Sequence, residues 1–214
     1  MPKVFSDEQE NKIKTFINLA LDFNKTHNIF SRESYDEVYE NDVLDCKPLI
    51  NHIKKNESVL DLGSGGGFPG ILLSIAKPEN KISLLESNNK KCYFLKKASY
   101  ELNLKNTKII NKTISKKNKL GRFDIITSRA FATIEKTINL TKTNTHRNTK
   151  YLLLKGKASS IKKELKDIDK NMFRYEIINQ DTTKERNIVL LCKDEKSNCN
   201  CEPKRRGWQN NNSS

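Results

Sequence analysis

Residues 59–70 read Val-Leu-Asp-Leu-Gly-Ser-Gly-Gly-Gly-Phe-Pro-Gly, and this stretch constrains the fold more than any other. A short apolar run enters from Ser58, which is typical of a buried strand. The glycines at positions 63 and 65–67 adopt positive φ freely and let the main chain approach a ligand closely. Pro69 favours the first turn of a helix, where its missing N–H costs nothing. The stretch therefore predicts a strand, a glycine loop and a helix whose N-terminal N–H groups face a ligand.

Three classes of ligand use a loop of this kind, and the flanking residues separate them. A P-loop ends in Gly-Lys-Ser/Thr, whereas Gly70 is followed by Ile71. Gly65, Gly67 and Gly70 match the G-x-G-x-x-G dinucleotide pattern, but that match alone is weak. The third pattern places an acid, Asp61, two residues before G-x-G-x-G. An acid suits S-adenosylmethionine, which carries an ammonium and a sulfonium but no phosphate, so we favour this methyl donor over a pyrophosphate or a turn without a ligand.

Length and composition indicate one domain that can bury a core and that favours a polyanionic partner. The chain has 214 residues, 35% of them hydrophobic, and a net charge of +14. Nucleic acid explains this charge most simply, and codon bias towards Lys, Asn and Ile is the alternative. The sequence has no apolar run long enough to cross a membrane and no apolar signal-peptide core, so we expect a cytoplasmic protein.

The five cysteines are odd in number and scattered, which favours reduced thiols. The lone C-x-C pattern of Cys199 and Cys201 is too weak to predict a metal site, and we expect none.

Residues 1–55 predict helices without an intervening strand. Ser6 and Gln9 have the spacing of a capping box, and apolar residues then recur at helical period to residue 23, before a polar break at 24–28. A third helical stretch is expected near 48–54. A second helix is expected between the first helix and this third stretch, and its inner side should carry Val38, Val43 and Leu44. We therefore expect an N-terminal helical extension that packs against a sheet.

From Ser58 onward, short apolar runs alternate with helical segments. Strands are expected at 81–86, 107–111, 123–128, 150–154, 172–179 and 186–192, and helices at 88–102, 133–140 and 159–166. Such alternation predicts parallel strands with helices on both faces, and the last two strands, with no helix between them, should be antiparallel. We predict an α/β class I S-adenosylmethionine-dependent methyltransferase fold (Rossmann-like). It has a seven-stranded mostly parallel sheet in residues 56–193, and a polar, disordered tail follows at 194–214.

Ligands of open α/β sheets lie outside the carboxyl ends of the strands, and four positions should converge there. The first is the glycine loop. The second is Glu86, which ends the next strand and can accept hydrogen bonds from both ribose hydroxyls, although it is alternatively a solvated acid. The third is the stretch 111–115, whose backbone can hold the adenine edge. The fourth is Ser128-Arg129-Ala130-Phe131, where methyl group and acceptor should meet.

The fourth position limits the chemistry. It carries neither the Asn/Asp-Pro-Pro-aromatic motif of amino-group methylation nor the cysteine nucleophile of cytosine C5 methylation. Arg129 stands there instead, and an arginine cannot serve as a base. It can clamp a cofactor carboxylate or the RNA backbone, or form a structural ion pair with Glu86 or Asp61. Guanine N7 would suit such a site, because its lone pair already points outward and only positioning is needed.

Three segments together resemble the bacterial RsmG (GidB) methyltransferases: Asp-Leu-Gly-Ser-Gly-Gly-Gly-Phe-Pro-Gly at 61–70, Phe-Asp-Ile-Ile-Thr-Ser-Arg-Ala at 123–130 and Leu-Lys-Gly at 154–156. The resemblance extends from about residue 24 to residue 191. It implies an S-adenosylmethionine-dependent enzyme that methylates guanine N7 in the decoding region of 16S ribosomal RNA, free or within the 30S subunit. Nothing in the sequence suggests more than a monomer.

The resemblance also assigns site residues. It implies that Gly63, Phe68 and Arg129 contact the cofactor and that Glu86 takes the ribose-binding place. Where the family carries a Glu-containing stretch, this chain has Thr113-Ile114-Ser115, and Asp42 stands where the family commonly has a histidine. The expected cofactor-binding residues are Asp61, Gly63, Gly65, Phe68, Glu86, Ile114, Ser115 and Arg129. Lys155 and Arg186 match basic positions and are expected RNA contacts, Arg129 and Lys155 are candidates for positioning, and no general base is expected.

Two other functions stay open on the sequence alone. A methyltransferase with a small-molecule or protein acceptor explains the loop and Glu86 but leaves the charge of +14 unexplained. A non-catalytic RNA-binding protein on the same fold is the other, because the altered 113–115 stretch leaves room for it.

Overall fold

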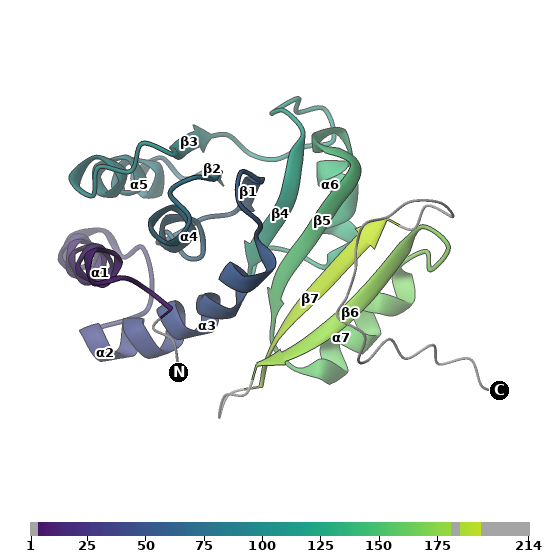
Figure 1. Cartoon of the computed structure of the whole chain (residues 1–214), viewed down its shortest axis with the longest axis horizontal. Coiled ribbons are helices and arrows are strands. Elements are labelled where there is room, and N and C mark those ends of the chain that lie inside the picture. Colours follow the sequence, from purple (N-terminus) through teal and green to yellow (C-terminus); the bar gives the residue numbers. More distant parts are fainter. Residues whose placement is uncertain (1–3, 181–184, 194–214) are drawn as a thin grey trace.

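One sheet in the order β3-β2-β1-β4-β5-β7-β6 organises the described residues, 4–180 and 185–193, of the computed structural model (Figure 1). Its strands are β1 (Ser58–Leu62), β2 (Lys81–Glu86), β3 (Thr107–Asn111), β4 (Phe123–Arg129), β5 (Thr145–Lys155), β6 (Phe173–Gln180) and β7 (Arg186–Lys193). β1 to β5 pair in parallel, and β7 runs antiparallel to both β5 and β6. The predicted seven-stranded, mostly parallel α/β sheet with an antiparallel last pair is confirmed.

Helices cover both faces of the sheet. They are α1 (Asp7–His27), α4 (Gly70–Ala76) and α5 (Asn89–Glu101) on one side, and α6 (Ile134–Thr141) and α7 (Ala158–Glu164) on the other (Figure 1). Alternate strand residues face opposite layers: Val59 joins the core cluster that contains α1, α4 and α5, whereas Leu60 and Leu62 join the cluster of α6 and α7. This period of two is what buries a strand on both faces. Short 3₁₀ turns follow as η3 (Lys142–Asn144) and η4 (Leu165–Asp167).

α1 extends four residues beyond the predicted end. The predicted capping box is present, because the Ser6 side chain accepts from the Gln9 backbone and the Gln9 side chain accepts in return. The predicted polar break at 24–28 is wrong for residues 24–27, which are helical, and only Asn28 lies outside the helix, with a φ of +47°. Asn24 lies inside the helix, and its side-chain oxygen accepts the N–H groups of Ile29 and Phe30 at 2.7 and 3.1 Å. A polar residue that is typical of a break here fixes the turn that follows the helix.

The segment after α1 is one irregular helical run rather than two separate helices. It comprises α2 (Tyr35–Val38), a π-helix η1 (Tyr39–Val43), α3 (Leu44–Cys46) and a 3₁₀-helix η2 (Lys47–His52). Val38 and Val43 are buried as predicted, but Leu44 is 37% exposed, which the sequence did not indicate. A π-turn holds more residues than an α-turn and rotates the residues that follow it. Asp42, Asp45 and Cys46 are consequently buried, while Leu44 faces outward.

β5 begins five residues before the predicted strand, at Thr145. Its first residues are polar, and the ladder is irregular there, with the β4 register shifting between Phe123 and Ile125. The Thr149 hydroxyl donates to the Phe123 carbonyl at 2.7 Å, so a side-chain hydrogen bond holds this start. No helix in the part of the chain that the structure describes is long and apolar enough to span a bilayer. The predicted tail at 194–214, including Cys199 and Cys201, lies outside the described residues.

Candidate active site

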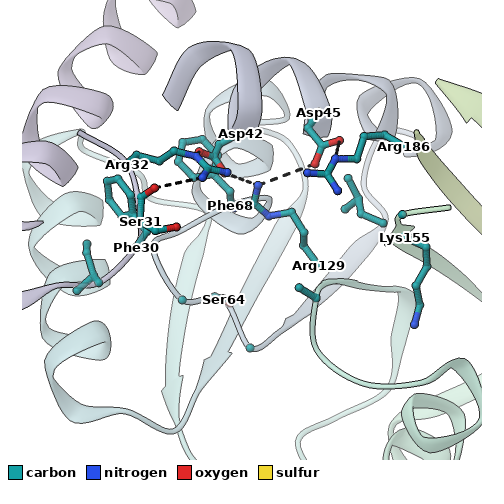
Figure 2. A pocket seen from close by; sticks show the side chains of 17 residues that line it. Phe30, Ser31, Arg32, Asp42, Asp45, Ser64, Phe68, Arg129, Lys155 and Arg186 are labelled. Atoms are coloured by element: carbon teal, nitrogen blue, oxygen red, sulfur yellow. Dashed lines mark hydrogen bonds and ion pairs between the residues drawn. The ribbon is translucent and has the colours of Figure 1, made fainter. Parts of the chain in front are cut away.

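A cavity of about 420 Å³ opens beside the glycine loop, where β1, β4 and β5 end and β7 begins (Figure 2). Four parts of the chain contribute: the turn after α1, the irregular helical run from α2 to η2, the glycine loop, and the strand ends that carry Arg129, Lys155 and Arg186. The lining residues are Ile29, Phe30, Ser31, Arg32, Asp42, Asp45, Gly63, Ser64, Gly65, Gly66, Phe68, Arg129, Ala130, Leu154, Lys155, Gly156 and Arg186. The structure thus brings Gly63, Gly65, Phe68, Arg129, Lys155 and Arg186 together from the predicted set.

The glycines of the loop divide into two groups. Gly63 and Gly65 have φ of +68° and +53° and line the cavity. Gly67 and Gly70 are packing positions: a Cβ on Gly67 would lie 2.7 Å from Phe16, and one on Gly70 would lie 2.6 Å from the Asp61 carboxylate. Of the glycines that match a ligand pattern, only the first group faces the site.

Asp61 lies beneath the loop and does not line the cavity. It is fully buried, and its Oδ2 accepts the Gly70 N–H at 3.2 Å. Its Oδ1 accepts no hydrogen bond from any residue that the structure describes. Burial raises the pKa of Asp61 to about 7, against the opposing effect of hydrogen bonds from Ser64 and Gly70. Any electrostatic effect of Asp61 on a ligand would therefore act through the loop that covers it.

Glu86 clamps the glycine loop to the start of α5. Its Oε2 accepts the Gly65 N–H at 2.9 Å, and its Oε1 accepts the N–H groups of Ser87 and Asn88 at 2.8 Å each. Glu86 is buried, which excludes the solvated strand-end acid. Glu86 itself does not line the cavity, but it holds Gly65, which does.

Arg129 stands in the middle of a chain of alternating charges across the cavity (Figure 2). Its guanidinium pairs with Asp42 and lies 3.9 Å from Asp45. Asp42 also accepts from Arg32 Nε at 3.0 Å, and Asp45 lies 3.6 Å from Arg186 Nε. The predicted alternative, an ion pair with Glu86 or Asp61, is wrong. Burial acts to lower the pKa of Arg129, but charged neighbours including Asp42 and Asp45 outweigh it and raise the pKa.

The aromatic side chain of Phe68 packs against the Arg129 member of this chain of alternating charges. The Arg129 guanidinium lies 5.7 Å from the centre of the Phe68 ring, within cation–π distance. Phe68 in turn packs on Phe16 of α1, with ring centres 4.9 Å apart. The loop, the N-terminal helix and the end of β4 are therefore fixed relative to one another at the cavity.

Lys155 and Arg186 line the same cavity but differ in their contacts and in their exposure to solvent. The Lys155 ammonium donates to the Ala132 carbonyl and to Glu164 at 2.7 and 2.8 Å, and Figure 2 shows it directed away from Arg129. The Arg186 side chain is 41% exposed and reaches the solvent-facing edge of the cavity.

Ile114 and Ser115 do not line the cavity. Ile114 is buried in the core cluster of α6 and α7, and the Ser115 N–H donates to Asn118. Their expected role beside the adenine stays a prediction.

The N-terminal segment also contributes to the cavity, which the sequence patterns did not indicate. Phe30, Ser31 and Arg32 come from the turn after α1, whereas Asp42 comes from the π-helix η1 and Asp45 from α3. The spacing of the two acids, three residues apart on one helical face, was the available pattern. It does not show that the partners would be Arg129 and Arg186, which follow much later in the chain.

The cavity suits a ligand that carries both charges. The methionyl part of S-adenosylmethionine has a carboxylate and an ammonium, and the cavity offers guanidinium groups beside carboxylates. Gly63 and Gly65 line it with their backbone, although their own N–H groups already bond to Leu85 and Glu86, so the predicted free N–H groups are not present at these two positions. The residues present therefore fit this cofactor.

Solved structures with this arrangement define the class of fold. A methyltransferase of Aquifex aeolicus, described as S-adenosylmethionine dependent, superposes with a TM-score of 0.57 at 13% identity, over 77% of this chain and 98% of that one. A mutant of MtNAS in complex with S-adenosylmethionine has a TM-score of 0.59 at 14% identity, covering 86% and 76%. The fold is that of the S-adenosylmethionine-dependent methyltransferases, as predicted.

Sequence comparisons then give the family. The family model described as "GidB: rRNA small subunit methyltransferase G" matches residues 9–192. The ribosomal RNA small subunit methyltransferase G of Brachyspira hyodysenteriae is 32% identical over 86% of this chain and 91% of its own length. That of Mycoplasma capricolum is 35% identical over 78% and 74%. The chain belongs to the GidB family of S-adenosylmethionine-dependent rRNA small subunit methyltransferases, which confirms the predicted family, enzyme class and cofactor.

Proposed function

We propose that this chain transfers a methyl group to N7 of a guanine in 16S ribosomal RNA. The observation that carries the choice of acceptor atom is the alternating charge chain. Both carboxylates that line the cavity, Asp42 and Asp45, face guanidinium groups, so they serve as partners of Arg32, Arg129 and Arg186 rather than as proton acceptors. Guanine N7 has a free lone pair and loses no proton on methylation, so a site without a general base suits it.

The methyl donor would be held by the loop and the charge chain. Gly63 and Gly65 offer backbone contacts, Arg129 can hold a carboxylate, and Phe68 supplies an apolar wall. When bound, S-adenosylmethionine supplies a sulfonium whose methyl group is already activated for transfer. The protein then needs only to align the acceptor nitrogen with that methyl group and to exclude water, which is catalysis by proximity and orientation.

The RNA would approach across the edge that Arg186 occupies. This edge is open to solvent, and an arginine there can neutralise a phosphate. Phe30 lines the opposite side of the cavity and offers a ring for the guanine to stack on. For the oligomeric state, we propose a monomer. An rRNA acceptor, free or in the 30S subunit, implies a cytoplasmic location.

The test is methyl transfer to 30S subunits that lack the modification, followed by mapping of N7-methylguanine by borohydride–aniline cleavage. We expect one cleavage, in the decoding region, and loss of transfer in Arg129→Ala. Label without cleavage would contradict the N7 assignment and keep the methyltransferase. Label only in protein or small molecules would contradict the RNA acceptor altogether.

A second measurement separates catalysis from binding alone. Calorimetric titration with S-adenosylmethionine should show one site per chain, with affinity lost in Arg129→Ala. No binding by the wild-type chain would favour the non-catalytic RNA-binding protein instead. Deproteinised 16S RNA in parallel with 30S subunits then decides which form is the acceptor.

A further inference from the structure

Two tyrosines stand on the outer face of α5 with most of their surface in solvent. Tyr93 is 64% exposed and Tyr100 is 84% exposed. They are seven residues apart, so they lie on the same side of the helix, about 10 Å apart along its axis. Each tyrosine presents a flat apolar ring with a polar hydroxyl, and two such rings on one helix face can stack on planar groups.

Tyr93 continues an aromatic cluster from α1, which lies beside α5 (Figure 1). The Phe23 ring lies 6.1 Å from Tyr93 and 5.1 Å from Phe94, which is buried. His27 stacks on the other face of this cluster, with its ring centre 4.1 Å from that of Phe23 and the planes 14° apart. The exposed Tyr93 ring therefore packs on one side against other aromatic rings.

The charge around these rings is positive. α5 carries four lysines, at positions 90, 91, 96 and 97, and a single acid, Glu101, at its end. Lys90, Lys96 and Lys97 are exposed. On α1, Asp22 is paired with Lys25 at 2.8 Å, and the charge of Lys97 also acts on it, helping to lower the pKa of the Asp22 carboxyl. Aromatic rings interleaved with lysines form the combination that binds single-stranded nucleic acid, with bases stacking and ammonium groups meeting phosphates.

This face begins at the edge of the candidate active site. Asn88, the N-cap of α5, donates its N–H to Glu86, which holds the glycine loop at Gly65. At the end of α1, His27 is followed closely by Ile29 and Phe30, which line the cavity. A strand of RNA that leaves the cavity on this side meets His27 and Tyr93 next.

We propose that this face, the α1–α5 platform made of His27, Tyr93, Tyr100, Lys90, Lys96 and Lys97, binds unpaired nucleotides of the RNA substrate outside the cavity. The proposal rests on the proposed function, because it assigns a second contact to the same RNA. Tyr93 and Tyr100 each stack on one base, and the lysines neutralise the phosphates between them. Recognition by stacking requires no particular sequence, so the platform holds the strand while the cavity selects the guanine.

The experiment is titration of the full chain with a short fluorescein-labelled oligouridylate, read by fluorescence anisotropy. Oligouridylate contains no guanine, so its binding does not depend on methyl transfer. Tyr93→Leu should weaken it about 5- to 150-fold, as expected for the loss of one base stack, whereas Tyr93→Phe keeps the ring and should bind as the wild type does. Lys97→Ala should lower the slope of log affinity against log salt by about 0.7.

Matched controls lie elsewhere on the protein. Tyr175, on the edge strand β6 at the other end of the sheet, is 37% exposed, and Lys136 is exposed on α6. Tyr175→Leu and Lys136→Ala should leave oligouridylate binding unchanged. Calorimetric affinity for S-adenosylmethionine should be the same in Tyr93→Leu and the wild type, which shows that the fold is intact.

The outcomes separate the two proposals. Unchanged oligouridylate affinity in Tyr93→Leu, or an equal loss in Tyr175→Leu, overturns the platform whatever the methylation assay shows. A loss of 30S binding without a loss of oligouridylate binding also overturns it, because the partner would then be a ribosomal protein. If Tyr93→Leu weakens oligouridylate binding while the wild-type chain methylates no RNA, the platform is supported and only the proposed function is contradicted.

Discussion

Arg129 at the end of β4 and Asp42 in the π-helix η1 form an ion pair that joins the N-terminal segment to the sheet at the edge of the cavity. Asp42 is only 4% exposed, and its other oxygen accepts from Arg32 Nε at 3.0 Å. One buried carboxylate therefore separates two guanidinium groups. Asp42 stands where a histidine was expected from the family resemblance, and the pairing gives it a physical role in this chain.

Asp42→Asn should lower the free energy of unfolding by about 1–3 kcal/mol. The substitution removes the charge that separates Arg32 from Arg129 and leaves Arg129 with only the more distant Asp45, at 3.9 Å. Removal of one partner from a fully buried pair costs about 3–5 kcal/mol, and we expect less because both arginine side chains are about one-quarter exposed. Urea denaturation measures the loss, which should shrink at high salt as the repulsion is screened.

The matched control is a surface pair. Lys55 and Glu79 lie 2.7 Å apart with side chains 67% and 52% exposed. Glu79→Gln should change the free energy of unfolding by no more than about 0.5 kcal/mol. Equal losses in the two variants would contradict the special role of Asp42.

Much of the sheet could be predicted because each strand is an apolar run with a defined end. β2 and β3 match their predicted bounds, and β4 exceeds them by one residue. The start of β5 could not be predicted, since Thr145 and Thr149 are buried through side-chain hydrogen bonds rather than through apolar character. Hydrophobic periodicity does not register a buried polar residue that is satisfied by a distant partner.

The candidate site was predictable on the sheet side and not on the helical side. The glycine loop and Arg129 follow strand ends, which topology brings to one edge. Asp42 and Asp45 depend on the π-turn, which changes the phase of the helix and turns Leu44 outward. Sequence period alone assumes a constant helical rise and rotation, so it placed Leu44 on the inner side.

The two kinds of loop glycine should respond differently to alanine. Gly70→Ala places a methyl group 2.6 Å from both the Asp61 carboxylate and Leu84 in a fully buried region, and should destabilise the protein by about 2 kcal/mol or more. In Gly65→Ala, the nearest atom to the new methyl group is the Gly63 carbonyl oxygen, at 3.7 Å. This variant should lose only about 1–2 kcal/mol, from its φ of +53°. Its main effect should be weaker cofactor binding, seen by calorimetry.

Gly156→Ala is the control for this comparison. Gly156 lines the same cavity without a positive φ, and its nearest contact would be the Glu185 carbonyl at 4.0 Å. It should retain wild-type stability. Similar melting temperatures for Gly65→Ala and Gly70→Ala would contradict the division of the loop into cavity and packing positions.

Arg186 and Lys155 should separate in an RNA-binding assay, although the sequence suggested RNA contacts for both. Arg186→Ala should weaken binding to 16S RNA and lower the slope of log affinity against log salt (the salt slope) by about 1. It should change the free energy of unfolding little. Lys155→Met removes donors from Ala132 and Glu164, so it should destabilise the chain by about 1–3 kcal/mol and leave the salt slope unchanged. Filter binding across a salt series measures both slopes, and a reduced slope in Lys155→Met would show a direct phosphate contact.

The stability of the protein should fall as pH rises from about 4 to about 7 because of Asp61. Its pKa is about 7 in the folded chain, against an ordinary value of 3.8, so in this window the folded state keeps a proton that the unfolded state has released. The contribution is complete below pH 4 and is lost as pH rises through 7, by up to about 4 kcal/mol. Asp61→Asn has no such proton, so the wild-type stability minus that of the variant should decline across the window. Other carboxylates cancel in this difference, and a difference that stays constant from pH 4 to pH 8 would show that Asp61 is already ionised in the folded protein.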